Sequence, residues 1–240
     1  MSDSQRKLLK ALIVGKPNVG KSTLLNSLVG EKVSIVSRKA QTTQRNTTGV
    51  ITKDNSQLIF FDTPGLNKIE KNIRISETFK TVAENVDVLI YMVDNTKKSQ
   101  SIDDQFRNWL NNNENKFKKK ILIINKIDCI EKVNLFEITK KINGVINFDE
   151  TFFISLSKKS GMERFLNWLE KQAYSNEWLF QETFKSNISK KNFLSELTRE
   201  KVFEYIHEEI PYNLEIKTDY IETSSNKSVS YTHLRAHETS

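Results

Sequence analysis

Short apolar runs recur along the first two thirds of the chain, and polar or glycine-containing segments separate them. Runs rich in Val, Ile, Leu and Phe are typical of strands that are buried on both faces of a sheet. Segments with apolar residues three or four positions apart, the spacing of a helix face, lie between the runs. This alternation predicts an α/β fold in which helices cover both faces of a mostly parallel sheet. The predicted strands are Ala11 to Val14, Leu58 to Phe61, Val88 to Val93, Ile121 to Ile124 and Phe152 to Ile154.

Helices are expected in the intervals between these strands. The first is Ser22 to Val29, and the glycine after it is placed to end it, because glycine readily adopts the left-handed conformation that closes many helices. Val50 to Thr52 is predicted to pair antiparallel with Leu58 to Phe61 around a turn at Asp54 and Asn55. The remaining predicted helices are Ile73 to Asn85, Asp103 to Asn112, Asn134 to Asn143 and Met162 to Ala173.

The composition excludes several classes of protein. The 240 residues include 7 Gly and 3 Pro, too few for a collagen-like or Pro/Gly-rich disordered chain. The single cysteine, Cys129, cannot form an intramolecular disulfide, and the N-terminus lacks the order of a secretory signal, so we expect a cytoplasmic protein. The apolar runs are shorter than the roughly 20 residues that span a bilayer. The net charge of +7 is a weak indication of an anionic partner such as nucleic acid.

A phosphate-binding motif follows the first predicted strand. The stretch from Gly15 to Ser22, GKPNVGKS, has the pattern GxxxxGK[ST] between a strand and a helix. Its glycines let backbone N–H groups face phosphate oxygens, while the lysine reaches the outer phosphates and the serine hydroxyl a magnesium ion. The alternative interpretation is an ordinary strand-to-helix turn. The predicted nucleotide contacts are Gly15, Asn18, Val19, Gly20, Lys21, Ser22 and Thr23, with Ser22 a magnesium ligand and Lys21 also catalytic.

A second motif, DTPG, follows the predicted strand Leu58 to Phe61. An aspartate at a strand end can hold magnesium through water, and the Gly65 N–H can point at a terminal phosphate. Loss of that phosphate would then release the segment behind the motif. On its own the tetrapeptide is also compatible with a plain turn. The predicted site residues here are Asp62, Thr63, Pro64, Gly65 and Leu66, with Asp62 a magnesium ligand and Gly65 catalytic.

A third motif, Asn125 to Asp128 (NKID), lies at the end of another predicted strand and indicates which base is bound. A carboxylate accepts two hydrogen bonds from the N1 and N2 donors of guanine, a face that adenine lacks. We therefore expect GTP and GDP rather than ATP. In this hypothesis Asn125 ties the base loop to the phosphate loop, the Lys126 stem covers the purine face and Asp128 selects guanine. A capped strand end is the alternative interpretation.

The motifs together resemble the Era family, bacterial GTPases of the translation-factor class that act in small-subunit assembly. The similar stretches are GKPNVGKSTLL from Gly15, SRKAQTTQR from Ser37, DTPGL from Asp62 and NKID from Asn125. The resemblance covers residues 8 to about 175. It implies a Ras-like P-loop GTPase domain with a three-layer, mostly parallel sheet, and as ligands GTP/GDP and Mg²⁺. It also implies binding to small-subunit rRNA and the small ribosomal subunit, peripheral contact with the inner membrane, and no DNA partner.

Further site residues follow only from this resemblance. Gln41-Thr42-Thr43 corresponds to the first switch of the family, with Thr43 as the threonine that completes the magnesium shell and takes part in catalysis. The fifth motif of the family, Ser-Ala followed by Gly, corresponds to Ser157 and Lys158, whose backbone would contact the guanine oxygen. A register that starts at Ser155-Leu156 is an open alternative.

The motif residues also indicate how hydrolysis would proceed. Leu66 stands where some GTPases have glutamine, and an apolar side chain cannot orient water by hydrogen bonding. Charge on the phosphoryl oxygens would then be stabilised by Lys21, magnesium and loop N–H groups, and the intrinsic rate should be slow. Asn18 matches an asparagine that helps related GTPases hold K⁺, which we state as a hypothesis.

The C-terminal third is predicted to be a separate, incomplete unit. A polar stretch from Trp178 to Lys191 is expected to be a linker, followed by an amphipathic helix, Leu194 to Glu209, and a strand, Leu214 to Ile221. This pattern resembles the start of a type II KH module, an α+β RNA-binding unit that clamps RNA with a GxxG loop. No glycine follows Gly161, so the clamp is absent. The expected organisation is residues 1–175 GTP-binding domain, 176–192 linker, 193–228 partial KH-like domain and 229–240 a tail that is not native.

Alternative functions were weighed against a hydrolysing switch in rRNA maturation. One is a nucleotide-gated binding protein with negligible turnover, which Leu66 favours. Another is a related GTPase with a different RNA partner, against which the stretch RKAQTT from Arg38 and the KH-like helix argue. A P-loop ATPase or kinase is disfavoured because NKID has no role there.

Overall fold

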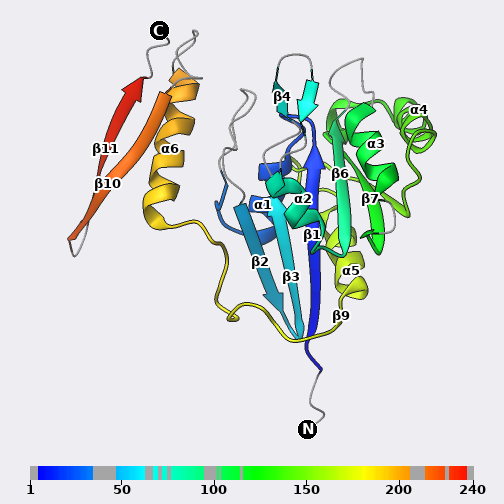
Figure 1. Ribbon diagram of the computed structural model, residues 1–240, viewed down its shortest axis with the longest axis horizontal. Coiled ribbons are helices and arrows are strands. Elements are labelled where there is room, and N and C mark those ends of the chain that lie inside the picture. Colours follow the sequence, from blue (N-terminus) through cyan, green and yellow to red (C-terminus); the bar gives the residue numbers. More distant parts are fainter. Residues whose placement is uncertain are drawn as a thin grey trace.

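A single twisted sheet forms the centre of the N-terminal part (Figure 1). The computed structural model describes residues 5–34, 47–62, 67–69, 72–74, 77–94, 102, 104–113, 116–205, 214–224 and 227–236. Within these residues the strand order is β2-β3-β1-β6-β7-β8, with the short β9 paired to the start of β1. The bounds are β1 Lys7–Gly15, β2 Thr47–Lys53, β3 Ser56–Asp62, β6 Val88–Asp94, β7 Lys119–Asn125, β8 Glu150–Phe153 and β9 Tyr174–Ser175.

The predicted α/β fold with a mostly parallel sheet is confirmed. Strands β3, β1, β6, β7 and β8 all pair in parallel, whereas β2 runs antiparallel to β3. The β2–β3 hairpin turns at Asp54, whose φ of 52° places it in the left-handed region that aspartate tolerates. The central strands are almost fully buried along their length, as the continuous apolar runs predict.

Helices cover both faces of the sheet. On one face α1 (Lys21–Val29) and α5 (Met162–Gln172) pack through Leu24, Leu25, Phe165 and Leu169. On the other face α2 (Glu77–Ala83), α3 (Asp104–Asn112) and α4 (Lys132–Asn143) supply the apolar side chains. The three-layer arrangement therefore holds the carboxyl ends of the parallel strands at one edge of the sheet. The residues packed on this second face include Phe79, Ala83, Phe106, Leu110 and Ile142, which meet Leu12, Tyr91 and Ile124.

The predicted helix Ile73 to Asn85 is too long at its start. Residues Asn72–Arg74 form β5, which pairs antiparallel with β4, Asn67–Ile69, and α2 begins only at Glu77. The apolar Ile73 belongs to this small hairpin, where it lies opposite Lys68. A single apolar residue at helical spacing does not distinguish a strand from the first turn of a helix.

The polar stretch predicted to be a linker packs against the central sheet. The Val50 N–H donates to the Lys185 carbonyl at 2.8 Å, and Gly49 forms an isolated β-bridge with Ser186. Phe180 and Phe184 stack with ring centroids 4.4 Å apart and cover an apolar cluster made by Leu8, Val50 and Ile59. Backbone hydrogen bonds and two phenylalanines four positions apart thus hold this segment against the sheet, despite its polar composition.

Beyond this segment lie one long helix and a β-hairpin (Figure 1). The helix α6 spans Lys190–Tyr205, so it begins four residues before the predicted Leu194, and residues 206–209 of the prediction lie outside the described residues. Strands β10 (Leu214–Ser224) and β11 (Lys227–Ala236) pair antiparallel, and the Ser195 hydroxyl donates to Thr218 Oγ1 at 2.9 Å to join α6 to β10.

The sequence from residue 229 onward has no clear period, yet residues 229–236 belong to β11. Residues 237–240 lie outside the described residues, and the domain boundaries remain predictions.

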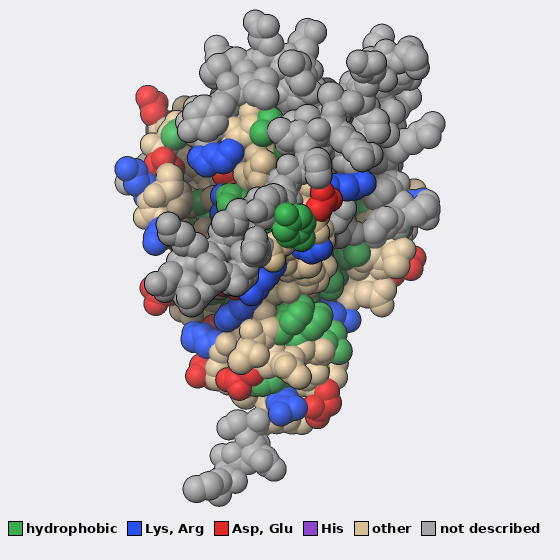
Figure 2. Space-filling view, turned by 90° about the vertical axis from the view of Figure 1, so that its left-hand side faces the viewer, with side chains coloured by type: hydrophobic (Ala, Val, Ile, Leu, Met, Phe, Trp, Pro, Cys, Tyr) green, Lys and Arg blue, Asp and Glu red, His purple; other side chains and the backbone are tan. Residues whose placement is uncertain are grey.

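Figure 2 views the molecule from the side on which α6 and this hairpin lie. On the coloured part of that face, Lys and Arg side chains are interspersed with Asp and Glu. No described helix is long and apolar enough to cross a membrane.

Candidate functional site

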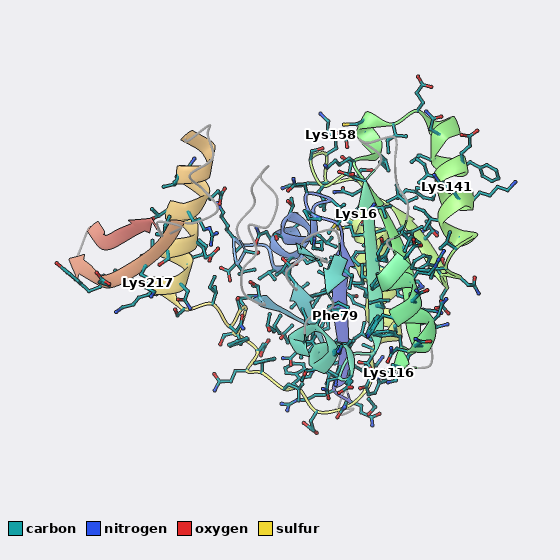
Figure 3. All side chains as sticks on the ribbon, turned by 45° about the horizontal axis from the view of Figure 1, so that its top comes forward. Lys16, Phe79, Lys116, Lys141, Lys158 and Lys217 are labelled. Atoms are coloured by element: carbon teal, nitrogen blue, oxygen red, sulfur yellow. The ribbon has the colours of Figure 1, made fainter. Side chains whose placement is uncertain are left out.

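The motif residues meet at one edge of the sheet. Gly15, Asp62 and Asn125 are the last residues of β1, β3 and β7, three strands that run in parallel. In open α/β sheets this carboxyl edge is where ligands bind. Lys16 and Lys158 lie toward this edge, whereas Lys116 lies at the opposite end of the sheet (Figure 3). The spacing of motifs along the sequence thus corresponds to a single place in the fold.

Close packing explains the two glycines of the phosphate loop. A Cβ atom on Gly15 would lie 2.3 Å from the Met92 carbonyl oxygen, and one on Gly20 would lie 2.5 Å from Asn125 Nδ2. Gly20 also has a φ of 106°, a left-handed conformation that other residues rarely adopt. The loop therefore turns sharply from β1 into α1 and leaves the helix N-terminus free for an anion.

Lys21 is buried inside this loop rather than extended into solvent. Its Nζ donates to the carbonyl oxygens of Gly15 at 2.9 Å and Lys16 at 3.0 Å. Burial lowers the pKa of Lys21, and the negative charge of Asp62 opposes that shift. A phosphate group beside this ammonium would favour its charged form and so oppose the effect of burial.

The Ser22 hydroxyl and the Asp62 carboxylate form the polar centre of the site. Ser22 Oγ donates to Asp62 Oδ2 at 2.8 Å, and Asp62 is fully buried. Among the described residues, the second oxygen, Oδ1, has no hydrogen-bond partner. Burial raises the pKa of Asp62, while Lys21, Ser22 and Ser34 act in the opposite direction. A buried oxygen that lacks a donor next to a serine hydroxyl fits a hard divalent cation such as Mg²⁺.

Asn125 connects the third motif to the phosphate loop. Its Nδ2 donates to the Val19 carbonyl at 2.9 Å, and its Oδ1 accepts from the Leu156 N–H at 3.3 Å. Because Asn125 is buried, both contacts are shielded from water and hold the two loops at a fixed separation. The tie that the sequence predicts between this asparagine and the phosphate loop is present.

Asp128 faces two serines of the loop that follows β8. Ser155 Oγ donates to Asp128 Oδ1 at 2.5 Å, and Ser157 Oγ donates to Oδ2 at 3.1 Å. These hydrogen bonds, chiefly the one from Ser155, lower the pKa of Asp128. The carboxylate is exposed and ionised at neutral pH, so it can accept hydrogen bonds from a ligand.

The same loop distinguishes the two registers of the fifth motif. The Lys158 N–H donates to Ser155 Oγ at 3.2 Å and is therefore engaged inside the turn. Ser155 is buried between Asp128 and Lys158, whereas the Lys158 side chain is exposed. This geometry favours the register that begins at Ser155 and Leu156 over the one that begins at Ser157. The geometry therefore disfavours the predicted contact between the Lys158 backbone and the guanine oxygen.

Sequence reasoning missed one charged partner in the site. Asp94, the last residue of β6, forms an ion pair with Lys126, whose Nζ also donates to the Asn18 carbonyl at 3.0 Å. An acidic residue directly after the apolar run Val88 to Val93 was the available signal, since the ends of adjacent parallel strands lie together. The predicted site residues Thr43, Thr63, Pro64, Gly65 and Leu66 lie outside the described residues.

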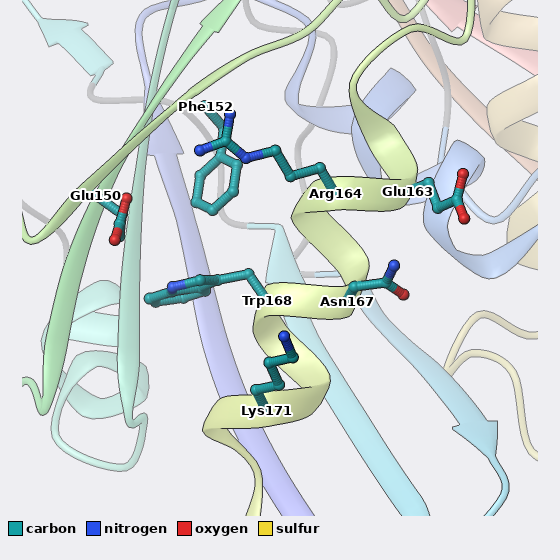
Figure 4. A pocket seen from close by; sticks show the side chains of 7 residues that line it. All are labelled: Glu150, Phe152, Glu163, Arg164, Asn167, Trp168 and Lys171. Carbon is teal, nitrogen blue, oxygen red and sulfur yellow. The ribbon is translucent and has the colours of Figure 1, made fainter.

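A separate cavity of about 460 Å³ lies between β8 and α5. Trp168 and Phe152 form its aromatic wall with ring centroids 5.6 Å apart, and Arg164 extends over the Phe152 ring (Figure 4). Its lining contains none of the motif residues. The nucleotide site is therefore defined by its backbone and polar groups and not by this cavity.

Comparisons with known proteins agree with this geometry. A family model described as "50S ribosome-binding GTPase" matches residues 10–126. The GTPase Era of Sinorhizobium medicae is 33% identical over 221 residues, which cover 90% of this chain and 70% of the relative. The GTPase Era of Brucella melitensis is 31% identical over the same shares of both chains.

Two solved structures are similar over almost the whole chain. The crystal structure of Era in complex with MgGDPNP and nucleotides 1506–1542 of 16S ribosomal RNA superposes with a TM-score of 0.86 and 32% identity, covering 97% of this chain and 80% of that one. An Era variant from Aquifex aeolicus bound to GDP and AlF4⁻ gives a TM-score of 0.83 and 31% identity, covering 95% and 78%.

Proposed function

This chain belongs to the Era family of GTPases, and we propose that it is a GTP-hydrolysing switch that acts on the RNA of the small ribosomal subunit. The observation that supports this proposal best is the meeting of Ser22, Asp62, Asn125 and Asp128 at one edge of the sheet. Phosphate, magnesium and guanine contacts are then available within a single site.

Magnesium and phosphate groups would be held by the phosphate loop and the end of β3. Ser22 and Asp62 supply oxygen ligands, and Thr43 is proposed as the third protein ligand. Lys21 and the N–H groups of the loop from Gly15 to Thr23 surround the phosphates. When bound, the magnesium ion neutralises charge on the phosphate oxygens. The unpartnered Asp62 Oδ1 supports this assignment.

Guanine would be bound by two side chains and a loop. Asp128 accepts hydrogen bonds from the two donors of the guanine edge, and the Lys126 stem covers one face of the ring. The backbone of the loop that begins at Ser155 and Leu156 is proposed to meet the guanine oxygen. Ser155 orients Asp128 through the hydrogen bond that lowers its pKa.

Hydrolysis is proposed to rely on charge stabilisation rather than on a side-chain base. Lys21 and the Gly65 N–H would face oxygens of the terminal phosphate as charge develops there. Leu66 cannot orient water, so the intrinsic rate should be slow. Asn18 would assist in holding K⁺ beside the phosphates. Equal hydrolysis rates in sodium and potassium buffers would contradict this role of Asn18.

The RNA role rests on family membership. The Era protein of the solved complex is bound to nucleotides 1506–1542 of 16S ribosomal RNA. In this chain α6 and the β10–β11 hairpin follow the GTPase domain, and Lys32 forms an ion pair with Glu200 of α6 at 2.6 Å. We propose that nucleotide state and rRNA binding are coupled across this contact, and that the protein works in the cytoplasm, where any contact with the inner membrane is peripheral.

Fluorescence anisotropy with a labelled RNA copy of 16S nucleotides 1506–1542 tests this function. We expect tighter binding in the presence of GDPNP and Mg²⁺ than in the presence of GDP, and weaker binding to an RNA of the same composition in scrambled order. Equal affinity for both RNAs in both nucleotide states would contradict the proposed partner, while leaving the GTPase activity in place.

A further inference from the structure

Two neighbouring strands end side by side at the nucleotide site. In the parallel pairing of β6 with β7, Asp94 lies opposite Asn125. The residue that follows β7, Lys126, begins the loop that leads to Asp128. The register therefore places a carboxylate within reach of the lysine that we assign to the purine face.

The Lys126 ammonium is held from two sides. Its Nζ donates to the backbone carbonyl of Asn18 in the phosphate loop at 3.0 Å and forms an ion pair with Asp94 at the end of β6. The side chain of Asp94 is 13% exposed and that of Lys126 35% exposed. The pair is thus partly shielded from water, where an ion pair is stronger than on an open surface.

The backbone of Lys126 is also constrained. Its φ of 61° lies in the left-handed region, which is uncommon for a residue other than glycine, asparagine or aspartate. Such a conformation persists only where surrounding contacts hold it. The backbone of Lys126 is held at the start of the turn Ile127–Cys129, and its ammonium is held by Asp94. These two contacts set the direction of the side-chain stem between them.

We propose that Asp94 is a positioning residue for the guanine nucleotide, which acts by fixing the Lys126 stem across the purine face. This inference rests on the proposed function, because it deepens the assignment of Lys126. Lysine is a flexible side chain whose ammonium is strongly hydrated, so a single carbonyl contact leaves the stem several alternatives. A second, charged anchor removes them before the nucleotide arrives, which lowers the entropy cost of binding.

Stopped-flow dissociation of mant-GDP tests the proposal. Asp94→Asn keeps the size of the side chain but removes its charge, and we expect dissociation about tenfold faster than in the wild type. Asp94→Glu keeps the carboxylate and should give a rate nearer to that of the wild type.

A double-mutant cycle separates positioning from general damage to the fold. Lys126→Met keeps an apolar stem but lacks the ammonium, so adding Asp94→Asn to it should change the dissociation rate no further. Asp87→Asn is the matched control, since Asp87 pairs with Lys118 at 2.8 Å just before the other end of β6. This control should leave mant-GDP dissociation unchanged.

The outcomes distinguish the inference from the function on which it rests. If Asp94→Asn releases mant-GDP at the wild-type rate, the positioning role is wrong, although guanine nucleotide binding stands. The same holds if Asp94→Asn accelerates dissociation equally in the wild-type and Lys126→Met backgrounds. Failure of the wild-type protein to bind mant-GDP would overturn the proposed function and the inference together. Asp94→Asn that accelerates dissociation only when Lys126 is present supports both.

Discussion

The Ser22 hydroxyl donates a 2.8 Å hydrogen bond to one oxygen of the buried Asp62 carboxylate and so joins the start of α1 to the end of β3. The two residues are 40 positions apart in the sequence. Among the described residues the other Asp62 oxygen is unpartnered, which leaves it available to a cation. The pair that joins α1 to β3 is therefore the pair that we assign to magnesium.

Removal of magnesium should weaken nucleotide binding through this pair. In the wild type we expect EDTA to lower GTP affinity by about ten- to a hundredfold, the size of a lost charge-assisted contact. Ser22→Ala should show most of that loss with Mg²⁺ present and little further change with EDTA. The matched control is Ser27→Ala, an exposed serine on the same helix. Isothermal titration with and without EDTA measures all three, and equal magnesium dependence of Ser22→Ala and wild type would contradict the assignment.

Base specificity should depend on the charge of Asp128. Asp128→Asn replaces an acceptor with an amide that can donate to the additional carbonyl of xanthine, so preference should move from GTP to XTP. We expect GTP affinity to fall by at least about a hundredfold, as in sites where buried polar partners are mismatched. Competition of XTP and GTP against a fluorescent nucleotide gives the ratio. Unchanged GTP affinity would refute the guanine contact.

Acid should weaken guanine binding at a pH set by Ser155. The hydrogen bond from Ser155 lowers the pKa of Asp128, so the carboxylate stays ionised below the ordinary aspartate range. Protonation removes the acceptor for guanine, and it occurs only at lower pH. Ser155→Ala should move this acid limb of GDP affinity upward, toward the ordinary aspartate value. Ser157→Ala, which removes a longer hydrogen bond, should move it less. A GDP titration series at decreasing pH reads both shifts, and identical acid limbs in all three proteins would show that Ser155 does not tune Asp128.

Local patterns were sufficient for the sheet and the motifs because both depend on residues close in sequence. The strands β1, β3, β6 and β7 are continuous apolar runs, and each motif follows a strand end. The register of the fifth motif was not accessible in this way. Both Ser155 and Ser157 donate to the distant Asp128, and only the burial of Ser155 and its contact with the Lys158 N–H distinguish the two, which requires the folded loop.

The attachment of the segment after α5 was also beyond local patterns. Its polar composition predicts a linker, but the buried Gln57 of β3 binds its backbone. Gln57 Oε1 accepts from the N–H groups of Leu179 at 2.9 Å and Phe180 at 3.1 Å, and Nε2 donates to the Phe180 carbonyl at 2.9 Å. Long-range partners of a single glutamine leave no periodic signal in the sequence.

Loss of this glutamine should loosen the segment without removing nucleotide binding. Gln57→Ala leaves partly buried backbone groups unpaired, and we expect the free energy of unfolding to fall by about 1–3 kcal/mol. Limited proteolysis should cut near residues 179–187 faster than in the wild type, while GDP affinity stays within about twofold. Gln181→Ala, an exposed glutamine of the same segment, is the control and should match the wild type. Equal unfolding midpoints of the two variants would contradict the anchoring role of Gln57.

Single-turnover hydrolysis of GTP, with protein in excess and Mg²⁺ and K⁺ present, tests the central claim most directly. The account predicts slow but complete conversion of bound GTP to GDP and phosphate, and no conversion by Lys21→Ala. Excess ATP should not reduce the conversion of GTP, because ATP does not compete for the guanine site. Recovery of intact GTP from the wild-type complex after prolonged incubation would contradict it, and would leave a protein that binds the nucleotide without hydrolysing it.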